Sequence, residues 1–186
     1  MGWSRRIMLN GNVLKRCAAV IATALLLAGC VLQSPEPLFA EGDGAPALAP
    51  LAKSYRAEVY ENDAWKRQDG SAIFTGEGNH YVMSNSKDKD VMEMLFVELG
   101  KARYVVQTQD HKQSTDPYIY FFADVRGDGI YLAIPDCDKL KTLPGVKEEV
   151  VFENYDCILK GKPARPFFAS LAGEMKDWKM RLVPEK

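Results

Sequence analysis

The stretch YIYFFADVRGDGIYLAI, residues 118–134, has the pattern of two strands joined by a tight turn. Its flanks are rich in aromatic and β-branched residues, which favour strands. Between them, Arg126-Gly-Asp-Gly129 supplies the glycine and aspartate that a reversal of the backbone requires. The sequence therefore predicts an antiparallel hairpin in this part of the chain.

Both faces of this hairpin are apolar. One set of alternating positions holds Tyr118, Tyr120, Phe122 and Tyr131, and the others hold Ile119, Phe121, Ile130, Leu132 and Ile134. A strand with two apolar faces lies inside a sandwich, beneath a helix or along a lined cavity. We expect a helix from the C-terminal part of the chain to cover one face, with a ligand cavity as the alternative.

Similar runs elsewhere predict further strands, at residues 55–60, 80–84, 103–108, 150–152 and 156–159. Residues 91–99 fit either a strand paired with 103–108 or a helix that begins at a capping box and ends at Gly100. The strand is favoured because the segment is short and adjoins a hairpin turn.

Residues 164–178 carry apolar side chains at intervals of three and four, which predicts an amphipathic helix. Residues 178–183 alternate, as a last strand would. The predicted fold is mainly β: an antiparallel curled sheet, small barrel or sandwich, with one C-terminal amphipathic helix.

Residues 1–29 have the layout of a secretory leader. Its charged residues are all basic: Arg5, Arg6, Lys15 and Arg16. The apolar run that follows them, residues 17–27, has roughly half of the 20 or so apolar residues that a bilayer-crossing helix needs. The segment therefore indicates a signal peptide rather than a permanent span.

The leader ends in Leu27-Ala-Gly-Cys30, which resembles the lipobox of bacterial lipoproteins. In that family the cysteine carries a diacylglyceryl group, the chain is cut just before it, and the new amino group is often acylated, for example with palmitate. The resemblance implies that Cys30 is the lipid-attachment residue and the first residue of the mature chain. Val31 follows it in place of aspartate, which implies export to the outer membrane. Two or three acyl chains would make the attachment effectively permanent.

Residues 30–54 contain several prolines and glycines and show no apolar periodicity. We expect them to form a flexible tether with a span of about 25–30 Å. The alternative is an ordered arm that docks on the domain through Leu38 and Phe39. Residues 55–186 then form a single antiparallel β domain of ordinary size.

Cys137 and Cys157 remain as a pair once Cys30 carries lipid. An exported protein lies in an oxidising compartment, where such a pair normally forms a disulfide. The closed loop would contribute roughly 3 kcal/mol in the chain-entropy model. A cysteine-based metal site is the alternative, but isolated cysteines without CxxC spacing argue against it.

The chain has 24 Lys and Arg against 25 Asp and Glu, and removal of the leader takes away only basic residues. The acidic mature chain argues against nucleic acid as a partner, since that requires a basic patch, and against strong binding to anionic headgroups. The expected partners are the membrane, through the lipid on Cys30, and an envelope protein or a small ligand.

Motifs for a known reaction, cofactor or metal are not found, and no residue is predicted to be catalytic. His80 and His111 are the only histidines, and the carboxylates Asp124, Asp128, Asp136 and Asp138 fit turns better than an EF-hand. The sequence favours a membrane-anchored, non-catalytic binding or scaffolding module of the bacterial envelope. The alternatives are an envelope hydrolase and, by fold-level analogy with small β-barrel lysozyme inhibitors, an inhibitor of a cell-wall hydrolase.

Overall fold

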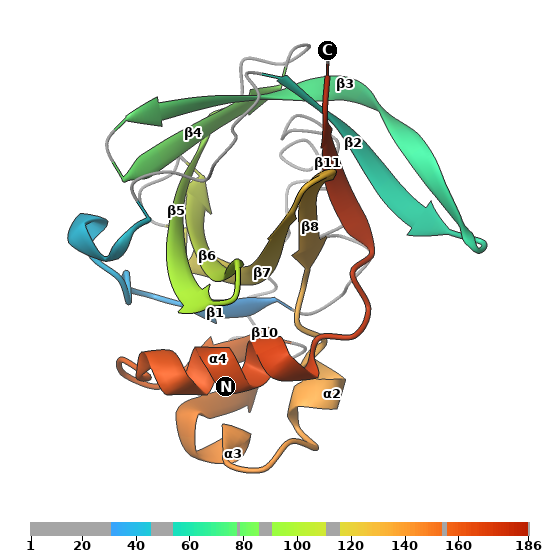
Figure 1. Cartoon of the computed structure of the whole chain (residues 1–186). Coiled ribbons are helices and arrows are strands. Elements are labelled where there is room, and N and C mark those ends of the chain that lie inside the picture. The colour runs from blue at the N-terminus through green and yellow to red at the C-terminus, as the bar shows by residue number, and fades with distance from the viewer. Residues whose placement is uncertain are drawn as a thin grey trace, which may run out of the picture.

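Eight antiparallel strands close into a barrel in this computed structural model, which describes residues 31–45, 54–77, 79–85, 91–110, 116–153 and 156–185 (Figure 1). Pairing of β6 with β7, and of β11 with both β2 and β8, completes the ring. The barrel strands are β2 (Ser54–Glu61), β3 (Ala64–Glu77), β4 (His80–Asn85), β5 (Val91–Gly100), β6 (Arg103–Asp110), β7 (Tyr118–Arg126), β8 (Gly129–Ala133) and β11 (Met180–Pro184). The prediction of a mainly antiparallel β fold is confirmed, and residues 91–99 form a strand.

Tight turns explain why neighbouring strands run antiparallel. The β2–β3 turn consists of Asn62 and Asp63, which both have positive φ, 51° and 60°, as a two-residue hairpin turn of the favoured type requires. At the predicted β7–β8 hairpin, Gly129 lets the Leu182 carbonyl of β11 approach where a Cβ atom would stand. A side chain at this position would therefore push β11 away from the barrel.

Side chains fill the barrel interior. Because successive residues of a strand point to opposite faces, every second residue enters this core. Its larger buried members are Tyr55, Phe74, Tyr81, Met83, Met94, Phe96, Phe121, Leu132, Met180 and Leu182. Phe121 and Leu132 belong to the predicted central hairpin, so one of its apolar faces lies inside the barrel.

The other face of the hairpin lies under a second layer, which we call the base layer. It consists of β1 (Leu32–Ser34), α2 (Cys137–Leu140), α3 (Val146–Glu149), β9 (Val150–Glu153), β10 (Asp156–Leu159) and α4 (Arg165–Glu174). Figure 1 shows α4 lying across the underside of the barrel beside β1 and β10. Phe168 of α4 packs on Tyr120, with ring centroids 6.1 Å apart. The predicted helix cover is confirmed, although the helix ends at Glu174 and Trp178 lies beyond it.

Residues 31–45, which we call the arm, differ from the predicted flexible tether. Leu32 is completely buried in β1, Phe39 packs against Phe168, and a short 3-10 helix, η1 (Glu41–Asp43), follows. The arm is ordered because Gln107 binds its backbone: the Gln107 Oε1 atom accepts hydrogen bonds from the amides of Leu38 and Phe39. Residues 46–53 of the predicted tether lie outside the described residues.

Residues 1–30, with the predicted leader and Cys30, also lie outside the described residues. None of the helices in the described part of the chain has the length and apolarity to cross a bilayer.

Candidate functional site

Aromatic rings line the outer wall of the barrel where β2, β3 and β8 meet. Tyr60 and Trp65 face each other across the β2–β3 hairpin, with ring centroids 5.2 Å apart. The Trp65 ring meets Tyr131 of β8 edge-on at 5.9 Å. Together with Arg126 and Arg181, these rings form what we call the aromatic–arginine face.

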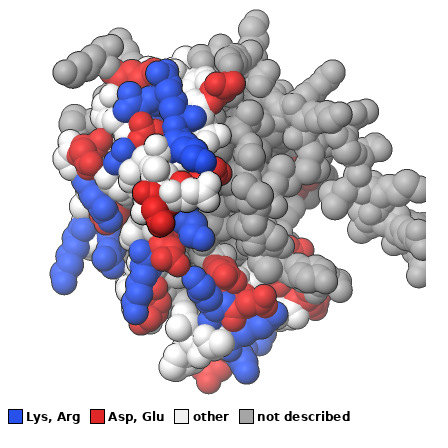
Figure 2. Space-filling view, turned by 90° about the vertical axis from the view of Figure 1, so that its right-hand side faces the viewer, with Lys and Arg blue, Asp and Glu red and all other residues white. Residues whose placement is uncertain are grey.

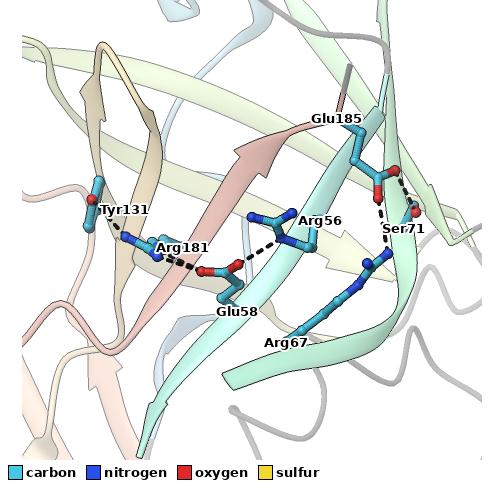
Figure 3. Close-up of polar contacts among 7 residues, drawn as sticks. All are labelled: Arg56, Glu58, Arg67, Ser71, Tyr131, Arg181 and Glu185. Atoms are coloured by element: carbon cyan, nitrogen blue, oxygen red, sulfur yellow. Dashed lines mark hydrogen bonds and ion pairs between the residues drawn. The ribbon is translucent and has the colours of Figure 1, made fainter. Parts of the chain in front are cut away.

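Strand register places the side chains of this face. Arg181 of β11 lies directly opposite Glu58 of β2 on one side and Tyr131 of β8 on the other. Glu58 is in turn opposite Arg67 of β3. Residues opposite each other on neighbouring strands project from the same face of a sheet. One row of outward side chains therefore crosses four strands of the wall (Figure 3).

Each arginine of the face lies over a ring. The Arg181 Cζ atom is 4.4 Å from the centroid of Trp65, and the Arg126 Cζ atom is 3.9 Å from that of Tyr131. Such contacts attract because the ring face carries partial negative charge. They also fix the guanidinium groups beside the rings.

Both arginines of the face have a carboxylate partner. Glu58, of which only 7% is exposed, accepts hydrogen bonds from Arg181 at 2.8 Å and from Arg56 at 2.7 Å. Burial raises the pKa of Glu58, but the hydrogen bonds from Arg181 and Arg56 outweigh it and hold the pKa below its usual value. Arg126 pairs with Asp124 at 2.9 Å. Arg181 and Arg126 are thus both paired, and Glu58 divides its single charge between Arg181 and Arg56.

A second carboxylate cluster continues the wall towards the end of β11. Glu185 accepts hydrogen bonds from Ser54 and Ser71, each at 2.7 Å, and pairs with Arg67 at 3.3 Å. Figure 3 shows the contacts with Ser71 and Arg67. The two serine hydroxyls lower the pKa of Glu185. Figure 2 shows acidic and basic side chains interspersed over the described part of this side of the molecule. The wall thus has no large patch of a single sign on the part that Figure 2 shows.

Chemically, this arrangement suits contact between surfaces. Tyr60, with 41% of its surface exposed, stands at the projecting end of the β2–β3 hairpin. Trp, Tyr and Arg are the residues that most often dominate the binding energy of protein interfaces. The rings are held by neighbours on the same wall, so little side-chain freedom would be lost on binding.

The four carboxylates noted in the sequence have structural contacts. Asp124 pairs with Arg126, Asp128 accepts a hydrogen bond from Tyr131, Asp136 caps α2 and Asp138 pairs with Lys141. They do not converge on one point, and the described residues contain no cluster of three or more acidic, histidine or cysteine side chains suited to a metal ion.

The other sequence candidates are dispersed. His80 begins β4, opposite Glu77 and Leu95, and His111 lies outside the described residues. Cys137 of α2 and Cys157 of β10 lie at disulfide distance, with Cα atoms 5.8 Å apart, inside the expected range. The cysteines join two elements of the base layer and lie away from the aromatic–arginine face.

Sequence reasoning named Tyr131 and Arg126 only as residues of the predicted hairpin and did not connect them with Trp65 or Arg181. Trp65, Tyr131 and Arg181 come from three distant segments, which only barrel closure brings together. A local signal for part of it was present in Tyr60-Glu-Asn-Asp-Ala-Trp65, where two aromatic residues flank a two-residue turn.

Comparison with protein-family models, curated proteins and solved structures finds no match to the chain. The candidate function therefore rests on the geometry of the wall and on the residues of the leader.

Proposed function

We propose that the chain is a non-catalytic docking module of the bacterial cell envelope, anchored to the outer membrane by lipid on Cys30. Its docking surface is the aromatic–arginine face. The single observation that carries the proposal is the set of contiguous rings of Tyr60, Trp65 and Tyr131 on an outer wall, with both adjoining arginines already paired.

The pairing of the arginines identifies the kind of partner. A surface that binds phosphate or carboxylate ligands presents unpaired guanidinium groups, whereas Arg181 and Arg126 are bound to Glu58 and Asp124. What remains for a partner is the exposed ring of Tyr60 and the partly exposed ring of Trp65, which packs on the buried ring of Tyr131. The partner is therefore an envelope protein that presents an uncharged, partly apolar patch.

The same contacts favour docking over hydrolysis. A hydrolase needs a nucleophile or a water-activating base placed near its substrate. Glu58 and Asp124 are instead engaged by arginines, which stabilises their ionised forms as ion-pair partners. A small ligand inside the barrel is also disfavoured, because aromatic and aliphatic side chains fill that space.

Photo-crosslinking in intact cells tests the proposal. A photoreactive amino acid at position 60 should capture a distinct envelope protein, and Trp65→Ala should abolish that product. Ile73→Ala is the matched control, because Ile73 is also an exposed apolar residue of β3. It lies eight residues from Trp65 along the strand, roughly 27 Å away. Equal crosslinking in both variants, or none from position 60, would contradict the proposed surface.

Inhibition of a cell-wall hydrolase is the second candidate, because the β2–β3 hairpin projects from the barrel as an inhibitory loop would (Figure 1). The purified protein should then slow the lysis of bacterial cell walls by a lysozyme. Replacement of Tyr60 and Trp65 by alanine should remove that effect. Lysis at the uninhibited rate in a molar excess of the protein would exclude this candidate for the enzyme assayed.

A further inference from the structure

We infer that the part of the base layer around Val31 lies directly against the bilayer that holds the lipid of Cys30. The inference rests on the lipid anchor proposed above. It goes further by assigning a membrane-facing surface to the folded domain, in place of a domain held away from the membrane by a tether.

The residue that directly follows the anchor residue belongs to the folded domain. The Val31 carbonyl accepts a hydrogen bond from the Cys157 amide at 3.3 Å, and Leu32 is fully buried. β1 then pairs on one edge with β7 and on the other with β10. Val31 is therefore already part of the folded domain.

Covalent geometry limits how far the domain can stand from its lipid. Consecutive Cα atoms lie about 3.8 Å apart, so the Cα atom of Cys30 is within one such step of Val31. A flexible tether of the predicted length would instead allow about 25–30 Å. Because no spacer separates the lipid-bearing residue from β1, the surface around Val31 must lie at the level of the headgroups.

Strand register identifies that surface. Leu32 is opposite Cys157 in the parallel pair, so Asp156 and the end of β9 at Glu153 lie on the same side as Val31. Neighbouring strands are about 4.8 Å apart, which places Glu153 roughly 10 Å from Val31. The end of β11 lies at the opposite edge of the barrel from α4 (Figure 1). Ile73 lies near this end, because it is opposite Ser54, whose carbonyl accepts a hydrogen bond from the Glu185 amide.

Charge is compatible with this placement. Between residues 134 and 179, which include most of the base layer, acidic and basic residues are equal in number. The acidic excess of the mature chain thus belongs to the rest of the molecule. The base layer as a whole therefore meets no overall repulsion from the negative potential of a membrane, and the two carboxylates beside Val31, Asp156 and Glu153, would oppose contact with anionic lipids only.

Fluorescence quenching on vesicles tests the inference. The full-length, lipidated protein is reconstituted into phosphatidylcholine vesicles that contain a lipid with a quencher on its headgroup. One variant, Glu153→Cys, carries a fluorophore near Val31, and a matched variant, Ile73→Cys, carries it at the far edge; both positions are exposed. We expect quenching to be several-fold stronger at position 153.

A spacer variant supplies the control. Insertion of about 20 Gly and Ser residues between Cys30 and Val31 leaves the described fold untouched and allows a span of about 25 Å. Quenching at position 153 should then fall to that at position 73. Equal quenching at the two positions without the insertion, in a protein whose Cys30 carries lipid by mass spectrometry, would overturn the inference alone. An unmodified Cys30 would overturn the anchor and the inference together.

Discussion

The base of the domain and its wall each contain a cluster of polar side chains, but the two clusters differ in chemistry. Under the arm, Gln107, Tyr120 and Ser34 form a buried and uncharged network. On the wall, Glu58 is as buried as Gln107, but it carries a charge, which Arg181 and Arg56 balance by ion pairs. Neutral groups can be buried if each finds a partner, whereas charges are costly to remove from water.

The difference shows how the fold separates stability from contact. The base network orders the arm and helps to close a second hydrophobic core, which lies between the barrel and the base layer. Burial raises the pKa of Tyr120 to about 12, so its hydroxyl remains protonated and able to donate to Gln107. The wall network instead fixes two arginines and leaves rings at the surface. Changes at the base should therefore act on the free energy of unfolding, and changes at the wall on partner binding.

The largest expected effect is at the base. Phe168 is completely buried and contacts both Phe39 and Tyr120, so Phe168→Ala should lower the free energy of unfolding by about 3–5 kcal/mol. Chemical denaturation measures this loss. Phe167→Ala is the control, because Phe167 is only partly buried and should cost clearly less. Similar losses in the two variants would show that the second core does not depend on Phe168.

Loss of the disulfide should have the next largest effect. Cys137 and Cys157 are 20 residues apart, and Cys157→Ser should lower the free energy of unfolding by roughly 3 kcal/mol. Cys137→Ser should match it, because the same bond is lost. Stability unchanged by either substitution, or by a reducing agent on the parent protein, would show that the cysteines are not bonded in solution.

Removal of the arm's polar partner should have a smaller effect. Gln107→Leu leaves the Phe39 amide without its acceptor, at a cost of about 1–3 kcal/mol. Hydrogen exchange of the Leu38 and Phe39 amides should accelerate at the same time. Gln109→Leu, on the same strand, is the control and should leave that exchange unchanged. Slow exchange in Gln107→Leu would mean that other contacts hold the arm.

A substitution on the wall should affect partner binding more than the free energy of unfolding. Trp65→Ala removes two aromatic contacts and one cation–π contact, which should cost about 2 kcal/mol of folding stability. The same variant should lose the crosslinked partner completely. A loss of stability as large as that of Phe168→Ala would mean that the wall, too, is part of the structural core.

The smallest effect should be a pH dependence from Glu58. Its pKa is lower in the folded than in the unfolded chain, so the ionised carboxylate stabilises the fold above the unfolded value. This stability is lost as pH falls through the folded value. Glu58→Gln should therefore flatten the acid side of a stability–pH curve, by an amount on the order of 1 kcal/mol. Glu61→Gln, in an exposed ion pair with Lys66, should leave the curve unchanged.

Local sequence patterns predicted most of the strands because their hairpins are encoded nearby, but they missed β1 and the longest strand, β3. Residues 118–134 contain both strands and their turn, and residues 91–108 do the same. Closure of the barrel was not predictable in this way, since β11 pairs with β2 across more than a hundred residues. The aromatic–arginine face depends on that closure, so it could not be read from any single segment.

The arm shows a second limit of local patterns. Pro35 and Pro37 interrupt any helix or strand period, which made residues 31–45 resemble a linker. Their order comes from distant partners: Leu32 and Phe39 enter the second core, and Gln107 satisfies the backbone that the prolines leave without regular pairing. Composition alone does not report such partners.

The position of β1 between two strands also has a mechanical consequence. A pull on residue 30 along the strand loads the hydrogen bonds to β7 and to β10 in shear, so they bear the force together rather than one after another. Force spectroscopy should therefore record a higher rupture force with the handle before Val31 than with a handle at the end of β9, which has a single paired neighbour. The Cys137–Cys157 link ties β10 to α2. If membrane flow drags the lipid, the load would enter the domain at a strand that is hydrogen-bonded on both edges.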